Sequence, residues 1–131
     1  MIRYRYATQL TPPAPFVTVG LRCPTTGHWL DAVPAQVDTA ADRTVVPDTA
    51  VAALHLVPDG HALFQGFAGE LVELPIYLIE IQVHDLPPVL VRAALGRGES
   101  FLLLGRDCLN AYRLLLDGPA LTLEIDRPPP P

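Results

Sequence analysis

Apolar and polar residues alternate along most of the chain, at the two-residue period of a β-strand with one buried face. A run of four apolar residues at 101–104 instead indicates a strand buried on both faces. Clusters of glycine, proline and aspartate separate these segments and indicate turns. The pattern predicts a mainly β protein, with strands at residues 16–21, 29–37, 43–46, 61–65, 70–84, 89–95, 101–104, 113–116 and 121–125.

Two segments interrupt the alternation and predict short helices. Small and aliphatic residues fill 50–56 after Pro47, and Asp48 or Thr49 offers a side chain for the N-cap. A second short helix is expected at 108–112. The fold class is therefore mainly β with one or two short helices.

The two ends of the chain differ in composition from its middle. Residues 1–14 are polar and aromatic and then rich in proline, which predicts an extended N-terminal arm. Residues 127–131 are nearly all proline and predict a disordered tail. Residues 15–126 are expected to form a single domain, because a chain of 131 residues, 50% of them hydrophobic, supplies one sizeable core.

Charge and composition exclude several kinds of partner. The formal net charge is −5, and the nine basic residues, all arginine, form no basic run, so nucleic acid is not expected. No apolar run reaches the roughly 18–20 residues that a membrane span needs. The first residues lack the apolar segment of a signal peptide, so the expected location is the cytoplasm. The two cysteines and four histidines show neither a disulfide framework nor metal-ligand spacing.

The candidate chemistry is concentrated in residues 35–47. A β-favouring approach ends at Val37 and delivers one carboxylate, Asp38, to a loop that contains a hydroxyl and two very small residues, from Thr39 to Ala41. Small side chains let backbone N–H groups approach the carboxylate, which keeps it ionised and fixes its direction. The pattern predicts a carboxylate held at the end of a strand. The alternative is an ordinary turn acid that caps nearby backbone.

Three motifs, in order, resemble those of the retropepsin-like aspartic proteases, the single-domain family that includes the retroviral proteases. The segment Asp38-Thr39-Ala40-Ala41-Asp42-Arg43-Thr44-Val45 resembles the active-site loop of the family, with Ala40 where the family has glycine. Gly66-Phe67-Ala68-Gly69 falls at the place of the glycine-rich flap. Leu103-Leu104-Gly105-Arg106-Asp107 resembles the apolar pair and the Gly-Arg-Asn or Gly-Arg-Asp that precede a helix. The resemblance covers roughly residues 15–125 and implies a closed β-barrel of the acid-protease type.

This resemblance implies an aspartic endopeptidase that acts as a homodimer, because a chain this short supplies only one of the two catalytic aspartates. Asp38 from each copy would form a dyad that shares one proton, and Thr39 would brace the two loops across the twofold axis. The ionised carboxylate activates a water molecule, and the protonated one polarises the scissile carbonyl of a peptide or protein substrate. The catalytic site implied is Asp38, Thr39 and Ala40, with no metal and no cofactor.

The resemblance also implies which residues hold the peptide and which support the loop. The substrate-binding residues implied are Ala41, Asp42, Val46, Gly66, Phe67, Ala68, Gly69, Leu103 and Leu104. Gly105 and Arg106 would provide structural support, with Arg106 paired to Asp42. The alternating ends at 2–6 and 121–125 would interleave as a dimer sheet. The alternatives are an ordinary hairpin turn at 66–69 and a surface arginine at position 106.

Ala40 leaves a second function open. Alanine keeps the backbone N–H group but adds a methyl group, which causes strain where the site needs a positive φ or a close approach. The alternative is a catalytically weak or inactive dimeric module of the same fold that binds peptides. Replacing Ala40 with glycine distinguishes the two, because a large gain in cleavage indicates a handicapped enzyme. A third interpretation, a small β-barrel with no peptide site, requires all three motif matches to be accidental.

Overall fold

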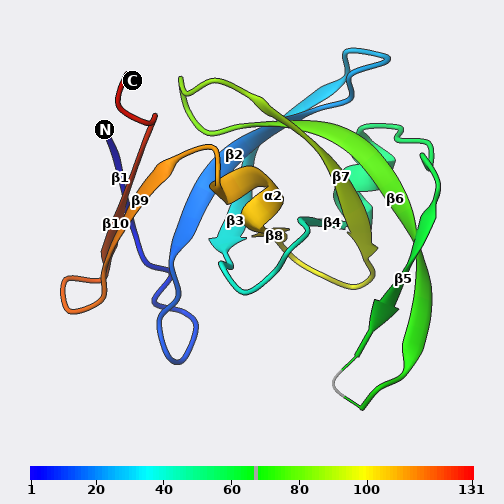
Figure 1. Cartoon of the computed structure of the whole chain (residues 1–131), viewed down its shortest axis with the longest axis horizontal. Coiled ribbons are helices and arrows are strands. Elements are labelled where there is room, and N and C mark those ends of the chain that lie inside the picture. The colour runs from blue at the N-terminus through cyan, green and yellow to red at the C-terminus, as the bar shows by residue number, and fades with distance from the viewer. Residues whose placement is uncertain (67) are drawn as a thin grey trace.

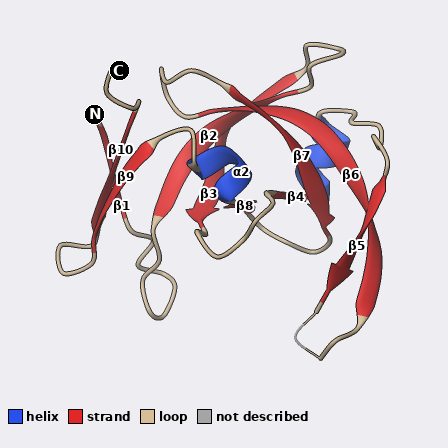
Figure 2. Ribbon diagram, viewed as in Figure 1, coloured by secondary structure: helices blue, strands red, loops and turns tan. Residues whose placement is uncertain are grey.

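The computed structural model describes residues 1–66 and 68–131, and its regular structure is mainly β. Seven strands form one sheet in the order β2-β3-β8-β4-β7-β6-β5. A further pairing of β2 with β6 closes six of these strands into a barrel, which β5 extends beyond β6 (Figure 1, Figure 2). The seven strands are β2 (Phe16–Arg22), β3 (Trp29–Val37), β4 (Val45–Pro47), β5 (His61–Gln65), β6 (Leu71–Gln82), β7 (Val89–Gly96) and β8 (Leu102–Leu104).

A second sheet carries both ends of the chain. Its three strands, in spatial order, are β1 (Ile2–Arg5), β10 (Thr122–Asp126) and β9 (Arg113–Asp117). Ile2 pairs with Ile125 within one chain, and the Arg3 guanidinium forms an ion pair with Glu124 at 2.6 Å. The ends that were expected to interleave with a second copy therefore pair with each other. The edges of this sheet are β1 and β9.

The two helices lie close to their predicted places but begin at other residues. Helix α1 (Asp48–Ala53) follows the extended Pro47 as its N-cap residue, without the expected side-chain cap, because Asp48 is already helical. Helix α2 (Arg106–Leu109) begins two residues before the predicted start at 108. Within the described residues, neither helix is long and apolar enough to cross a membrane.

Aliphatic side chains fill the interior of the barrel, as the two-residue alternation predicts. Leu21, Ile79, Ile81 and Leu102 are at most 1% exposed and come from strands that are far apart in the sequence. Burying each such side chain contributes on the order of 1.5–3 kcal/mol. This closed core gives the loops at the strand ends a rigid support.

Candidate active site

The loop that contains Asp38 is shaped by β8, which lies between β3 and β4. Leu104 pairs with Val37 of the parallel strand β3, and Leu103 pairs with Val45 of the antiparallel strand β4. The loop 38–44 must therefore pass around the end of β8. The Asp38 N–H group donates to the Leu104 carbonyl at 3.0 Å, which ties the start of the loop to β8.

The Asp38 carboxylate is held by backbone N–H groups, as its small neighbours predict. Its Oδ1 atom accepts hydrogen bonds from the Ala40 N–H at 3.1 Å and the Ala41 N–H at 3.3 Å. The residue is half-buried, whereas Thr39 and Ala40 are exposed. Among the described residues, Oδ2 has no hydrogen-bond partner, so it is available to a ligand. The arrangement presents one fixed, accessible carboxylate oxygen.

A threonine and an aspartate that sequence reasoning did not select hold the far side of the loop. The fully buried Thr44 donates from its N–H group to both Asp107 carboxylate oxygens, at 3.1 and 3.0 Å, and from its hydroxyl to Oδ1 at 2.7 Å. The same hydroxyl accepts the Gly105 N–H at 3.2 Å. The only sequence signal for this bond network is the place of both residues inside the two motifs. The network joins the loop directly to the start of α2.

Gly105 supports the loop because the chain passes too close for any side chain. A Cβ atom built on Gly105 would lie 2.6 Å from the Arg43 carbonyl carbon and 2.9 Å from the Thr44 nitrogen. Both neighbours are backbone atoms, which do not move aside as a flexible side chain does. The supporting role implied for Gly105 thus has a steric basis.

Arg106 contacts the loop through carbonyl groups and not through Asp42. Its Nη1 atom donates to the Thr39 and Ala40 carbonyls, each at 3.0 Å, and its N–H group donates to the Ala41 carbonyl at 2.8 Å. No Arg106–Asp42 ion pair occurs in the described structure, so the expected pairing is wrong in this respect. The turn at 39–41 points its carbonyl groups toward α2. The Arg106 guanidinium therefore reaches these carbonyls and not the Asp42 carboxylate.

Two of the apolar residues expected to contact the peptide lie in the core. Val46 and Leu104 are both 0% exposed, so neither side chain is available to a ligand. Their neighbours Val45 and Leu103, paired across β4 and β8, are half-buried. Because successive side chains in a strand point to opposite faces, Val45 replaces Val46 as the candidate, and Leu103 stays one.

Strands β5 and β6 form the hairpin that was expected to act as a flap. Gly66 donates its N–H to the Glu70 carbonyl, and Gly69 donates its N–H to the Gly66 carbonyl, each at 3.0 Å. Gly66 is half-buried, while Ala68 and Gly69 are exposed. The expected flap residue Phe67 lies outside the described residues. The hairpin is present, and its role as a cover stays a prediction.

The hairpin meets the Asp38 loop at one aromatic contact. The Arg43 guanidinium carbon lies 5.8 Å from the centre of the Phe64 ring, within the range of a cation–π interaction. Figure 1 shows the loop after β3 between the three-stranded sheet at the left and this hairpin at the lower right.

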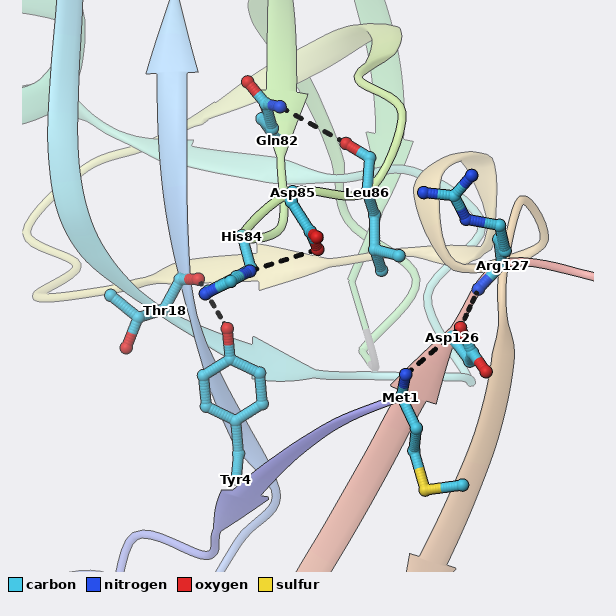
Figure 3. A network of polar contacts seen from close by, with 9 residues as sticks. All are labelled: Met1, Tyr4, Thr18, Gln82, His84, Asp85, Leu86, Asp126 and Arg127. Atoms are coloured by element: carbon cyan, nitrogen blue, oxygen red, sulfur yellow. Dashed lines mark hydrogen bonds and ion pairs between the residues drawn. The ribbon is translucent and has the colours of Figure 1, made fainter.

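A pocket larger than the one beside Arg43 lies away from Asp38. It measures about 700 Å³ and lies over β2, β3 and β6, with Tyr4, Thr18 and His84 in its lining. Figure 3 shows the Tyr4 side chain pointing toward Thr18, whose carbonyl accepts its hydroxyl at 3.3 Å, and burial raises the pKa of this tyrosine. The hydrogen bonds of Asp38, and not the size of a cavity, therefore identify the candidate site.

Both cysteines are buried free thiols. Burial, together with the neighbouring carboxylate of Asp107, raises the pKa of the Cys108 thiol to about 12. The hydroxyls of Thr25 and Thr26 lower the pKa of the Cys23 thiol to about 7. Cys23 lies in the turn between β2 and β3, and so it is not part of the Asp38 loop. Within the described residues, no three potential ligands are grouped to hold a metal ion.

Comparison with known proteins gives a result at the level of the fold. No protein-family model and no curated protein matches the chain. The crystal structure of a retropepsin-like aspartic protease from Rickettsia conorii superposes with a TM-score of 0.60. The match covers 95% of this chain and 91% of the Rickettsia conorii chain, at 10% sequence identity. The fold is retropepsin-like. An identity this low supports a relation in fold alone, so the chemistry must be argued from the Asp38 loop.

Proposed function

We propose that this chain is an aspartic endopeptidase that works as a homodimer. The observation that carries the proposal is the Asp38 carboxylate, whose Oδ1 atom is held by two backbone N–H groups at the end of β3 in a retropepsin-like fold. Backbone bonds of this kind fix the direction in which the carboxylate points. The accessible Oδ2 atom is the one that would face a water molecule.

Catalysis would use Asp38 from both copies as one dyad. Two carboxylates a few Å apart share one proton, because ionising both is unfavourable. The ionised carboxylate takes a proton from the attacking water, and the protonated one donates a hydrogen bond to the scissile carbonyl. The pair titrates as a unit, so its two pKa values belong to the dyad.

The edge strand β9 supports the dimer in this proposal. Leu115 is 59% exposed and Leu116 is 44% exposed, so both faces of this strand carry an uncovered leucine. An edge strand with unpaired backbone groups and exposed leucines is a template for pairing with another chain. Antiparallel pairing of β9 with the partner's β9 about a twofold axis would bury the same surface on both copies. The two three-stranded sheets would then form one sheet of six strands.

The peptide would bind as an extended strand between the Asp38 loop and the β5–β6 hairpin. Val45 and Leu103 are the half-buried apolar side chains that border the loop. They favour apolar residues on either side of the scissile bond. Closure of the hairpin would exclude water from the dyad, and residues 66–69 would make that contact.

One of the two physical arguments for the non-catalytic alternative, backbone strain at position 40, does not apply to this structure. Positive φ values occur at four described non-glycine residues, and Ala40 is not among them. Alanine therefore occupies its position without left-handed strain, and its N–H group still donates to Asp38. A peptide-binding module without turnover remains the result that a failed cleavage assay would favour.

Cleavage of a diverse peptide mixture from about pH 3.5 to 7, read by mass spectrometry, tests the proposal. Wild-type protein is compared with Asp38→Asn, whose amide oxygen still accepts the two N–H bonds but cannot act as a base. We expect cuts by the wild type that the variant loses by at least about a hundredfold. An absence of cuts at concentrations where sedimentation shows a dimer would overturn the catalytic proposal.

A charge on β9 tests the dimer separately. Leu116→Glu places two like charges together if β9 pairs with its twofold copy, so we expect a folded monomer without cleavage activity. Leu63→Glu, on the outer strand of the hairpin at 66% exposure, is the matched control for the loss of an exposed leucine. If both variants form dimers as the wild type does, β9 is not part of the dimer interface.

A further inference from the structure

A small pocket is lined by charged side chains, two of them from the Asp38 loop. It measures about 260 Å³, and its lining is Asp42, Arg43, Arg92 and Asp107. Asp42 and Arg43 belong to the Asp38 loop, whereas Arg92 comes from β7 and Asp107 from α2. Two positive and two negative groups meet here, so their existing partners decide what the pocket can bind.

Two of the four charged groups already have partners inside the protein. Asp107 accepts three hydrogen bonds from the Thr44 N–H and hydroxyl groups. The Arg92 Nε atom lies 3.2 Å from an Asp59 carboxylate oxygen, and its Nη2 atom donates to the Asp59 carbonyl at 2.6 Å. The ion pair with Asp59 offsets the charge of Arg92, whereas Asp107 keeps its negative charge but has its oxygens occupied by the Thr44 donors.

Arg43 is fixed in place but lacks a carboxylate partner. Its Nη1 atom donates to the Arg92 carbonyl at 3.2 Å, and its guanidinium lies over the Phe64 ring. Among the described residues, no carboxylate lies within ion-pair distance of it. A guanidinium carries five N–H donors in a planar fork, so the remaining donors of Arg43 are available. The residue is half-buried, which strengthens its attraction for a carboxylate relative to a fully exposed arginine.

We propose that Arg43 makes this pocket a subsite that selects an acidic side chain of the substrate peptide, an inference that rests on the proposed peptidase function. A carboxylate matches the guanidinium fork in charge and geometry. Arg43 lies five residues beyond Asp38, and five extended residues span at most about 18 Å. The acidic residue would therefore lie within about five positions of the scissile bond.

Selection at this subsite depends on direct contact and not on a general positive field. The carboxylate of Asp42 has no hydrogen bond or ion pair among the described residues and offsets much of the positive charge of Arg43 at longer range. The whole chain carries a formal charge of −5, so acidic peptides are not attracted from a distance. An acid is favoured only where it reaches the guanidinium itself.

Binding without cleavage gives the cleanest test. A random library of ten-residue peptides is selected on immobilised Asp38→Asn protein and on the same protein with Arg43→Gln or Arg127→Gln added. The Arg127 control removes one exposed arginine far along the chain, in the C-terminal tail. We expect about tenfold enrichment of aspartate or glutamate at one position by Asp38→Asn, lost with Arg43→Gln and kept with Arg127→Gln. Absence of that enrichment, or its survival with Arg43→Gln, would overturn the subsite.

Cleavage by the wild type separates the two proposals. Glutamate and glutamine versions of one cleaved peptide are compared by their kcat/KM values, and we expect about a tenfold preference for glutamate that Arg43→Gln removes. Cleavage without that preference overturns the subsite alone. Acid enrichment in binding without any cleavage by the wild type supports the subsite and overturns the peptidase.

Discussion

The loop 38–44 and the tip of the β5–β6 hairpin are both short connections that contain small residues, yet the structure holds them in different ways. The loop is tied to β8 through the Leu104 carbonyl and to α2 through Asp107 and Arg106. The hairpin tip is held by bonds inside the hairpin, from Gly66 to Glu70 and from Gly69 to Gly66. Groups that carry out chemistry need a fixed geometry, whereas a cover must be able to move. The difference in bonding therefore agrees with the proposed division of roles.

The glycines of the two regions show the same contrast. Gly105 is required because a Cβ atom would collide with the Arg43 and Thr44 backbone. Gly69 adopts a φ of +83°, and among the described residues only the Gln65 side chain comes near its Cβ position, at 3.9 Å. The first glycine is needed for packing and the second for local backbone shape. Four substitutions test this comparison, and they follow in order of decreasing effect.

Gly105→Ala should have the largest effect on stability. Because the added methyl group meets backbone, we expect the free energy of unfolding to fall by about 3 kcal/mol. Denaturant unfolding measures the change. Gly118→Ala is the control, since a Cβ atom there meets no described residue within 4 Å, and it should stay within about 0.5 kcal/mol of wild type. Equal effects at the two positions would refute the close approach at Gly105.

Thr44→Val removes the hydroxyl that joins the loop to α2 while keeping the volume of the side chain. The Gly105 N–H loses its acceptor and Asp107 loses one donor, so we expect a loss of about 2 kcal/mol in unfolding free energy. Thr18→Val, at an exposed position of β2, should change it by less than about 0.5 kcal/mol. A Thr44→Val protein as stable as wild type would mean that the remaining backbone bonds hold the loop.

Leu71→Gln tests the hairpin as a cover. This leucine is 68% exposed, so the unfolding free energy should change by less than about 0.5 kcal/mol. If the hairpin closes on a peptide, kcat/KM should fall by about fivefold, because apolar contact with the substrate is lost. Leu90→Gln on β7, where the leucine is 56% exposed, should leave kcat/KM unchanged. Equal activity of both variants would argue against closure at Leu71.

Ala40→Gly should have the smallest effect. Ala40 has no positive φ and its N–H group already donates to Asp38, so glycine relieves no strain there. We expect kcat to change by less than about threefold in peptide cleavage assays. A gain of tenfold or more would show that the methyl group of Ala40 hinders the dyad.

Much of the fold could be predicted from the sequence because strands with one buried face have a regular period. The segments predicted at 29–37 and 61–65 coincide with β3 and β5. The capping of α1 was predicted incorrectly, because Asp48 is already helical and the extended Pro47 is the N-cap residue. The alternation of apolar and polar residues reflects which face of a strand is buried, and the positions of these strands follow mainly from that pattern.

The sequence by itself determined the mainly β class, the order of strands β2 to β10 along the chain and the small residues around Asp38. Only the tertiary structure decided that Val45 and Leu103 border the loop while Val46 and Leu104 are buried, because alternation gives a period but not its phase. The tertiary structure also brought Arg92 of β7 beside Arg43. Contacts between residues 49 positions apart depend on how the strands pair in the closed barrel, and no local pattern records that pairing.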